Sequence, residues 1–241
     1  MSKMEKLLKI PYAVFNDWNQ LQQFLERKGN PRYELVGDVN LGNRKDISDL
    51  GNLVRVYGDL NLGFSSIISL RNLEYVGGDL SLDETPIQSL GNLEYVGGYL
   101  NLEYTSIESL GNLEYVGGYL YLTAIPIQSL GNLEYVGGDL DLINTPIQSL
   151  GNLKYVGGDL HLSNTPIKSL GNLVRVDGYL KLFGTPIKSL GNLEYVGGNL
   201  NLRETPIKSL GNLEYVGDAV ILSRQHQIPK EQLTKFKIQY L

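Results

Sequence analysis

A repeat of 20 residues occupies most of this chain and restricts it to one kind of fold. From position 50 to 209 the sequence consists of eight consecutive blocks of that length, and partial copies extend it over 33–49 and 210–222. The block at 130–149 reads LGNLEYVGGDLDLINTPIQS. A period of this size is the signature of a solenoid, in which each unit packs only against its neighbours. The blocks therefore serve as an internal alignment, in which constant positions report what each coil needs.

The constant apolar positions predict a coil with an interior filled by leucine. Leu100 and Leu102 are two residues apart, so both point to the same face of a short strand. The other constant apolar positions of that block are Leu90, Leu93, Val96 and Ile107. A single coil cannot exclude water from its two open ends. We therefore expect the coils to stack and their strands to pair in a parallel sheet.

The sequence predicts a mostly β, α/β repeat solenoid with about ten short parallel strands. Their centres are expected near Val39, Leu60, Leu80, Leu100, Leu120, Leu140, Leu160, Leu180, Leu200 and Val220. The pair Gly97-Gly98 precedes a strand, where we expect a tight corner with a positive φ that glycine adopts most easily. After the strand, most blocks carry a proline that fixes φ.

The pattern Leu100-x-Leu102-x-x-Thr105-x-Ile107-x-x-Leu110 resembles the leucine-rich-repeat signature, read from its strand onward. The short period is similar to the bacterial-effector type, and such tandem copies also occur in phage-encoded proteins. The resemblance covers about four-fifths of the chain. It implies a curved solenoid whose parallel sheet lies on the concave side.

One position departs from the family pattern. The family has an asparagine where this chain has Thr85, Thr105, Thr145, Thr165, Thr185 and Thr205, with Ser65 and Ile125 as exceptions. A threonine hydroxyl can bond to neighbouring backbone, whereas the side chain of Ile125 cannot. We therefore expect a weak point of the stack at Ile125.

The two ends of the chain are expected to be helical caps, which gives three segments: 1–32, the solenoid at 33–222, and 223–241. Asn16 or Asp17 can begin a helix that runs to about Lys28 and stops at Gly29. Its apolar residues fall on one face, as expected of a helix that covers the first coil: Trp18, Leu21, Phe24 and Leu25. A separate partner-binding helix is the alternative. A second helix is predicted from Pro229 to Leu241, with Leu233, Phe236 and Tyr240 facing the last coil.

Composition excludes several kinds of chemistry. The chain has no cysteine, so disulfides and cysteine-based metal sites or catalysis are excluded. The formal net charge of −5 argues against general binding to nucleic acid or anionic membranes. No apolar run is long enough for a signal peptide or a membrane span, so we expect a cytoplasmic protein of the producing or host cell.

The sequence contains no motif of an enzyme or a cofactor site. It has neither a glycine-rich phosphate loop nor a His-Glu-x-x-His motif, and we expect no catalysis and no cofactor. The alternative rests on His161, whose neighbours in the expected strands include Asp139, Asp141 and Asp159. Such a cluster can bind a metal or act as acid and base, but an open sheet does not exclude water from it.

The residues that flank the inner leucines vary from block to block and define a candidate binding face. Because side chains alternate along a strand, these residues point outward. The partner-binding candidates are Asp59, Asp79, Tyr99, Tyr104, Tyr119, Tyr121, Asp139, Asp141, Asp159, His161, Tyr179, Lys181 and Phe183. Exposed aromatics among polar residues are typical of binding hot spots. Random drift is the alternative, but drift on a solvated face favours small polar residues.

The charge on this face is one-sided. The face carries only two cationic side chains, Lys181 and Arg203, but nine carboxylates. These are Asp59, Asp79, Asp83, Glu84, Glu103, Asp139, Asp141, Asp159 and Glu204. A partner with a basic surface would be attracted to them. A second row drifts towards lysine, at Lys168, Lys188 and Lys208. These lysines can balance the charge of nearby glutamates. That explains the drift towards lysine without nucleic-acid binding, which we do not expect.

Two constant polar rows are expected to stabilise the stack. An asparagine recurs in every coil, as at Asn52 and Asn72, and a buried amide there can bond to the next coil. A tyrosine recurs at most coils, as at Tyr95 and Tyr115, and we expect these rings to stack, with a binding surface as the alternative.

The sequence therefore favours a protein-binding module with an acidic, tyrosine-rich concave face. The resemblance to effector-type and phage-encoded repeats suggests a sharper form, an inhibitor that blocks a basic, nucleic-acid-handling host protein such as a defence nuclease. The alternative is a structural spacer or virion-associated repeat protein with no dedicated site.

Overall fold

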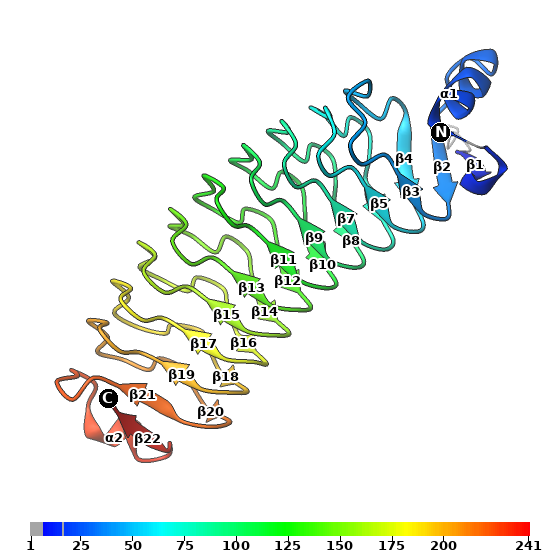
Figure 1. The fold of residues 1–241 in the computed structure, drawn as a ribbon. Coiled ribbons are helices and arrows are strands. Elements are labelled where there is room, and N and C mark those ends of the chain that lie inside the picture. Colours follow the sequence, from blue (N-terminus) through cyan, green and yellow to red (C-terminus); the bar gives the residue numbers. More distant parts are fainter. Residues whose placement is uncertain (1–6, 16) are drawn as a thin grey trace, which may run out of the picture.

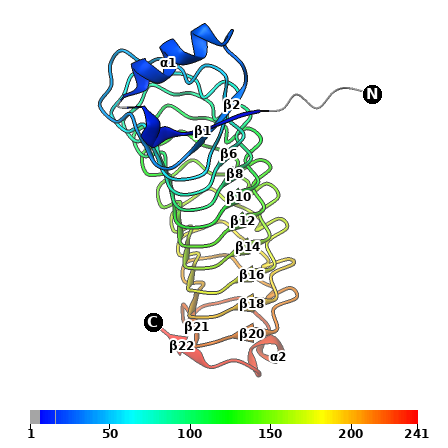
Figure 2. The same ribbon diagram turned by 90° about the vertical axis from the view of Figure 1, so that its right-hand side faces the viewer.

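A computed structural model describes residues 7–15 and 17–241 as an elongated stack of about ten coils (Figures 1 and 2). Each full coil contributes one short strand to each of two parallel sheets. Every strand pairs with the equivalent strand of the next coil, 20 residues further on in the regular part of the stack. The chain is thus a mostly β, parallel solenoid with leucine-rich strands.

The first sheet, called sheet B here, contains the strands that the sequence predicted, and it ends with one that was not predicted. Its strands are β3 (Val39–Asn40), β5 (Leu60–Asn61), β7 (Leu80–Ser81), β9 (Leu100–Asn101), β11 (Leu120–Tyr121), β13 (Leu140–Asp141), β15 (Leu160–His161), β17 (Leu180–Lys181), β19 (Leu200–Asn201), β21 (Val220–Leu222) and β22 (Ile238–Tyr240).

The second sheet, sheet A, was not predicted. Its strands are β1 (Leu8–Pro11), β2 (Tyr33–Val36), β4 (Leu53–Val56), β6 (Tyr75–Val76), β8 (Tyr95–Val96), β10 (Tyr115–Val116), β12 (Tyr135–Val136), β14 (Tyr155–Val156), β16 (Arg175–Val176), β18 (Tyr195–Val196) and β20 (Tyr215–Val216). Most of these strands have only two residues. The constant aliphatic residues here, such as Leu93 and Val96, are three residues apart, so the alternation that marks the sheet B strands at Leu100 and Leu102 is absent.

The interior holds the constant apolar positions, as predicted. Leu100, Leu102 and Ile107 are fully buried, as are their equivalents in the central coils, and all belong to one continuous core. Each buried leucine contributes about 1.5–3 kcal/mol relative to an exposed one. Ile125, the expected weak point, is also buried and packs in this core.

The glycine pair before each sheet B strand is needed for a different reason from the one predicted. Gly97 and Gly98 do not have a positive φ. Instead, a Cβ on Gly97 would overlap with the carbonyl oxygen of Gly77 in the preceding coil. The backbones touch here because Gly98 N–H donates to the carbonyl of Gly78 at 2.8 Å. The pair therefore allows close approach of coils.

Polar side chains satisfy the backbone at the turns. The six threonines donate their hydroxyls to the carbonyl three residues earlier, as Thr145 does to Leu142 at 2.7 Å. Several of the constant asparagines donate to the preceding coil, as Asn132 does to Gly111 at 3.2 Å. These amides are partly or fully exposed rather than buried, so that part of the prediction was wrong.

The N-terminal helix forms as predicted. Helix α1 spans Trp18–Arg27, and the Asp17 side chain accepts a hydrogen bond from the backbone N–H of Gln20 at 2.8 Å. Asn16, the other candidate for the first position, lies outside the described residues. Leu21 and Leu25 are buried in the common core, and Figure 2 shows α1 lying across one end of the stack. The short 3-10 helix η1 (Tyr12–Val14) precedes it.

The predicted C-terminal helix is wrong for most of its length. Helix α2 is a single turn, Lys230–Leu233, and the chain then forms β22, which pairs with β21 in sheet B. Leu233 is buried and Phe236 packs against the core, but Tyr240 is exposed. The open edge of β21 explains the outcome, because its unpaired backbone groups accept another strand.

Across 7–15 and 17–241, none of the helices has the length and apolar character needed to cross a membrane.

We predict that Leu142→Ala lowers the free energy of unfolding by about 2–5 kcal/mol, because it leaves a cavity inside one coil. The matched control is Asp141→Asn, which changes the neighbouring outward side chain but keeps the oxygen that accepts a hydrogen bond from Ile143 N–H. Unfolding in urea measures both. Equal losses for the two variants would show that the inside and outside of the coil are wrongly assigned.

Candidate partner-binding surface

The register of sheet B brings the variable residues into rows. Tyr121 pairs with Asp141, Asp141 with His161, and His161 with Lys181, so each row runs along the stack. We call this surface the sheet B face, and it comprises the residues just before, within and just after the sheet B strands. The predicted binding residues all lie on it, and none is buried: Asp59, Asp79, Tyr99, Tyr104, Tyr119, Tyr121, Asp139, Asp141, Asp159, His161, Tyr179, Lys181 and Phe183.

The aspartates just before the strands have a structural role that the sequence analysis missed. One carboxylate oxygen of Asp139 accepts the backbone N–H of Asp159 in the next coil at 2.8 Å. Asp159 does the same for Tyr179 at 2.7 Å, and Asn199 for Ala219 at 3.1 Å. The same bond recurs at Asp38, Asp59 and Asp79. This aspartate ladder joins coil to coil, and the recurrence of Asp or Asn at most of its positions was the sequence signal that could have revealed it.

Tyrosine interrupts this ladder three times. Tyr99, Tyr119 and Tyr179 occupy ladder positions, but a tyrosine ring has no oxygen near the next coil's backbone. Within the described part of the chain, the N–H groups of the following coils, at Tyr119, Asp139 and Asn199, have no protein acceptor. Each interruption gives up a hydrogen bond whose net contribution is about 0.5–1.5 kcal/mol.

Within the strands, a second row of side chains closes the turn that follows. Asp141 accepts the N–H of Ile143 at 2.9 Å, and Asn101 accepts that of Glu103 at 3.0 Å. Asparagine and aspartate commonly bond to backbone two residues ahead in this way. Tyr121, His161 and Lys181 replace them in their coils.

Three tyrosines gather at the centre of the face. The ring centroids of Tyr119 and Tyr121 are 6.0 Å apart, and those of Tyr99 and Tyr121 are 6.3 Å apart at a steep angle. Their exposed fractions are 47% for Tyr119, 39% for Tyr121 and 36% for Tyr99. Burial, and then the carboxylates of Asp79 and Asp59, raise the pKa of Tyr99, so its phenol stays neutral. The patch thus presents three partly exposed aromatic rings to solvent.

Two more aromatics of the face stand on a left-handed backbone. In the central coils, the position three residues after the sheet B strand has a φ between 52° and 70°; it holds asparagine or glycine in some coils, as at Asn144 and Gly184, and glutamate or alanine in others. Phe64 and Tyr104 hold this conformation with φ of 58° and 57°. A left-handed conformation costs an ordinary residue about 1–2 kcal/mol. Tyr104 is nevertheless 62% exposed, so packing does not repay that cost.

His161 lies between the carboxylates of Asp141 and Asp159. Its Nδ1 is 3.7 Å from Asp141, and its Nε2 is 3.4 Å from Asp159 and 2.8 Å from Lys181 Nζ. Nε2 thus faces a donor, Lys181, and an acceptor, Asp159, which require opposite hydrogen-bonding roles of this nitrogen. Among the residues of the chain that are described, no group of three or more His, Cys, Asp or Glu side chains is placed to hold a metal ion.

The constant tyrosines form a stacked row on sheet A. The centroids of Tyr95 and Tyr115 are 4.6 Å apart with an angle of 2°, and the row runs from Tyr75 to Tyr155. Its rings pack against each other as predicted. The hydrogen bond from Tyr155 to Asp177, with burial second, raises the pKa of Tyr155 to about 12. The lysines of the other row, Lys168, Lys188 and Lys208, are exposed.

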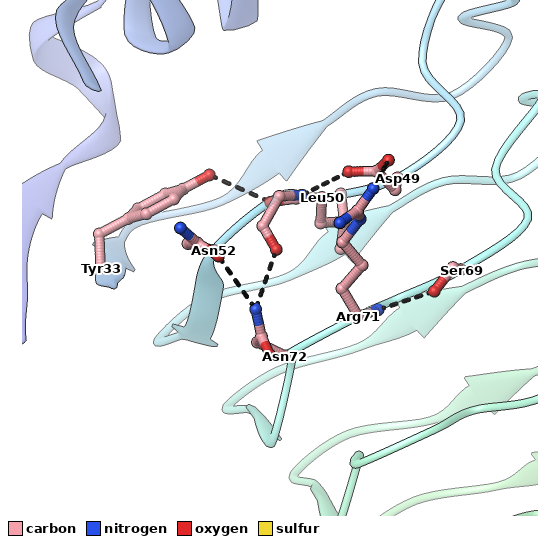
Figure 3. Close-up of polar contacts among 8 residues, drawn as sticks. Tyr33, Asp49, Leu50, Asn52, Ser69, Arg71 and Asn72 are labelled. Carbon is pink, nitrogen blue, oxygen red and sulfur yellow. Dashed lines mark hydrogen bonds and ion pairs between the residues drawn. The ribbon is translucent and has the colours of Figure 1, made fainter. Parts of the chain in front are cut away.

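A hollow of about 290 Å³ lies where α1 meets the first coils. Figure 3 shows the polar groups at its wall: Asn72 donates to Asn52 at 3.1 Å, and Arg71 pairs with Asp49 at 2.9 Å. The buried hydroxyl of Tyr33 donates to the carbonyl of Leu50 at 3.4 Å. These groups pair with one another, so the arrangement links the first coils and needs no ligand.

Comparison with protein-family models, curated proteins and solved structures finds no match to this chain. The sheet B face is therefore interpreted from its own chemistry.

We predict that Tyr104→Asn raises the free energy of unfolding by about 1 kcal/mol, because asparagine tolerates the left-handed backbone that tyrosine resists. The reciprocal change at the equivalent position, Asn144→Tyr, should lower it by a similar amount. Urea unfolding midpoints measure both effects. A destabilised Tyr104→Asn variant would show that the ring contributes packing rather than strain.

Proposed function

We propose that this chain is a leucine-rich-repeat protein that binds another protein on its sheet B face. The observation that carries this proposal is the replacement of ladder aspartates by Tyr99, Tyr119 and Tyr179. A residue that gives up a coil-to-coil hydrogen bond and leaves an aromatic ring in solvent works against the stability of the free protein. Retention of such residues is expected where a partner covers the ring.

The composition of the patch fits a protein partner. Tyrosine offers a large contact area with few rotatable bonds, so little entropy is lost on binding. Tyr104 supports the same interpretation, since it places an exposed aromatic ring on a left-handed backbone that disfavours a bulky side chain.

The charge of the face indicates a partner with a basic surface. The ladder needs only an oxygen acceptor, and Asn199 shows that a neutral amide supplies it. Asp59, Asp79, Asp139 and Asp159 therefore provide more charge than the stack requires. In its sharper form, the proposal is that this chain is an effector or phage inhibitor that blocks a basic, nucleic-acid-handling host protein. That form rests on the resemblance of the repeat to effector-type and phage-encoded repeats.

The ends of the solenoid are proposed to be caps. Trp18, Leu21 and Leu25 of α1 contribute to the core at one end, and Ile228 and Leu233 at the other. A stack of coils must cover its open apolar ends to remain monomeric.

Affinity capture with the full chain from the native host tests the function. We expect one stoichiometric partner, and Tyr119→Ala and Tyr121→Ala should each weaken its binding by about 1–3 kcal/mol, mainly through faster dissociation. The matched control is Tyr215→Ala, which removes an equally exposed tyrosine from sheet A and should leave binding unchanged. A complex lost with Tyr215→Ala but kept with the sheet B variants would place the interface elsewhere.

The acidic residues should act on the rate of association. Asp139→Asn combined with Asp159→Asn keeps the ladder oxygens but removes two charges, so association should be slower and less dependent on salt. The charge control on sheet A is Glu94→Gln combined with Glu114→Gln. Absence of any specific partner would favour the structural spacer.

A further inference from the structure

A hollow of about 310 Å³ opens at the centre of the sheet B face. Three successive sheet B strands and the turn after β9 contribute to its wall. The polar and aromatic side chains in its wall include Glu103, Tyr119, Tyr121, Asp139, Asp141 and His161. The hollow is thus walled by two aromatic rings and by carboxylates from different coils.

The carboxylates at this hollow retain unused acceptor capacity. Asp139 and Asp141 each use one oxygen for a backbone N–H, and the second oxygen of Asp141 is 3.7 Å from His161 Nδ1, beyond hydrogen-bond distance. In 7–15 and 17–241, neither lysine nor arginine forms an ion pair with Glu103, Asp139 or Asp141. Lys181 contacts the opposite ring nitrogen of His161 instead. Among the described residues, no lysine or arginine neutralises these three carboxylates, and the nearest ring nitrogen of His161 is 3.7 Å from Asp141.

The aromatic walls select among cations. Tyr119 and Tyr121 present exposed rings inclined by 25° at a centroid separation of 6.0 Å. A cation over a tyrosine ring is attracted by the negative face of the ring. Arginine suits this site better than lysine, because its planar guanidinium stacks on a ring and offers several donors in a fixed fork to carboxylates.

The same fold already makes such a contact on its other sheet. The guanidinium carbon of Arg175 lies 3.8 Å from the centroid of the Tyr195 ring in the next coil, and its Nε is 2.6 Å from Asp177. The spacing of coils is therefore compatible with a guanidinium that stacks on one tyrosine while it pairs with a nearby carboxylate.

We propose that the hollow receives the guanidinium group of an arginine side chain of the partner protein. This inference rests on the proposed function and names the chemical group that the partner contributes. Tyr119 and Tyr121 supply the stacking surface, Asp141 and Asp139 accept hydrogen bonds through their second oxygens, and Glu103 adds charge from the preceding coil.

The test uses the full chain with ring-labelled tyrosines and three blocked tripeptides, glycine-X-glycine, in which X is arginine, lysine or citrulline. Citrulline has the shape of arginine without its charge. In NMR titrations we expect saturable shifts of the Tyr119 and Tyr121 ring signals with the arginine peptide, and binding at least about tenfold weaker with citrulline. Signals are assigned with Tyr119→Phe and Tyr121→Phe. Equal responses to all three peptides, or none to arginine, overturn the proposal.

Asp141→Asn is the decisive variant, because it removes charge from the hollow and keeps the hydrogen bond to Ile143. Arginine binding should fall, whereas Asp59→Asn, outside the hollow, should leave it unchanged. Unchanged binding by Asp141→Asn also contradicts the proposal. If the arginine peptide binds but no protein partner exists, only the proposed function is contradicted. If a partner binds this face equally well after its arginines are replaced by lysine, only this inference is contradicted.

Discussion

Backbone hydrogen bonds between equivalent residues of successive coils are the interaction on which this structure depends. Leu100 N–H donates to Tyr119 in the next coil, and Gly98 N–H to Gly78 in the preceding one, both within 2.9 Å. Bonds of this length require backbones to touch, which excludes a Cβ at Gly97, and they require each coil to have the same shape. The constant leucines meet that second requirement, because they fill every coil with the same side chains.

The outward residues of sheet B serve this interaction as well as facing solvent. The aspartate ladder extends the coil-to-coil bonding beyond the strands, and in several coils an asparagine or aspartate of the strand closes the turn that follows, as Asp141 does. Variation on the face is therefore restricted, and a departure such as Tyr119 has a cost that can be measured in the free protein. The free energy that the stack gives up at such positions is the physical basis for assigning a partner to this face.

The sequence determined the inside of each coil because burial requires the same leucines in every block. The ten predicted strands of sheet B and the outward set at Tyr99, Tyr121 and Asp141 followed from the spacing of the constant leucines. Sheet A was missed because it has no pair of constant leucines two residues apart, as sheet B has at Leu100 and Leu102. The role of Gly97 depends on contact between coils that are distant in sequence, as does the pairing of β22 with β21. The hollow at Tyr121 could not be predicted, because its walls come from three coils and depend on the distance between them.

Amide hydrogen exchange at Asp139 and Asp159 tests the ladder most directly. Asp159 N–H donates to the carboxylate of Asp139, whereas Asp139 N–H faces Tyr119 and has no such acceptor. The account predicts that Asp139 N–H exchanges faster than Asp159 N–H, and that Tyr119→Asn slows it to the rate of Asp159, because the new amide oxygen restores the bond. Equal protection of the two N–H groups in the unaltered protein, or no response to Tyr119→Asn, would contradict the claim that tyrosine gives up a coil-to-coil hydrogen bond.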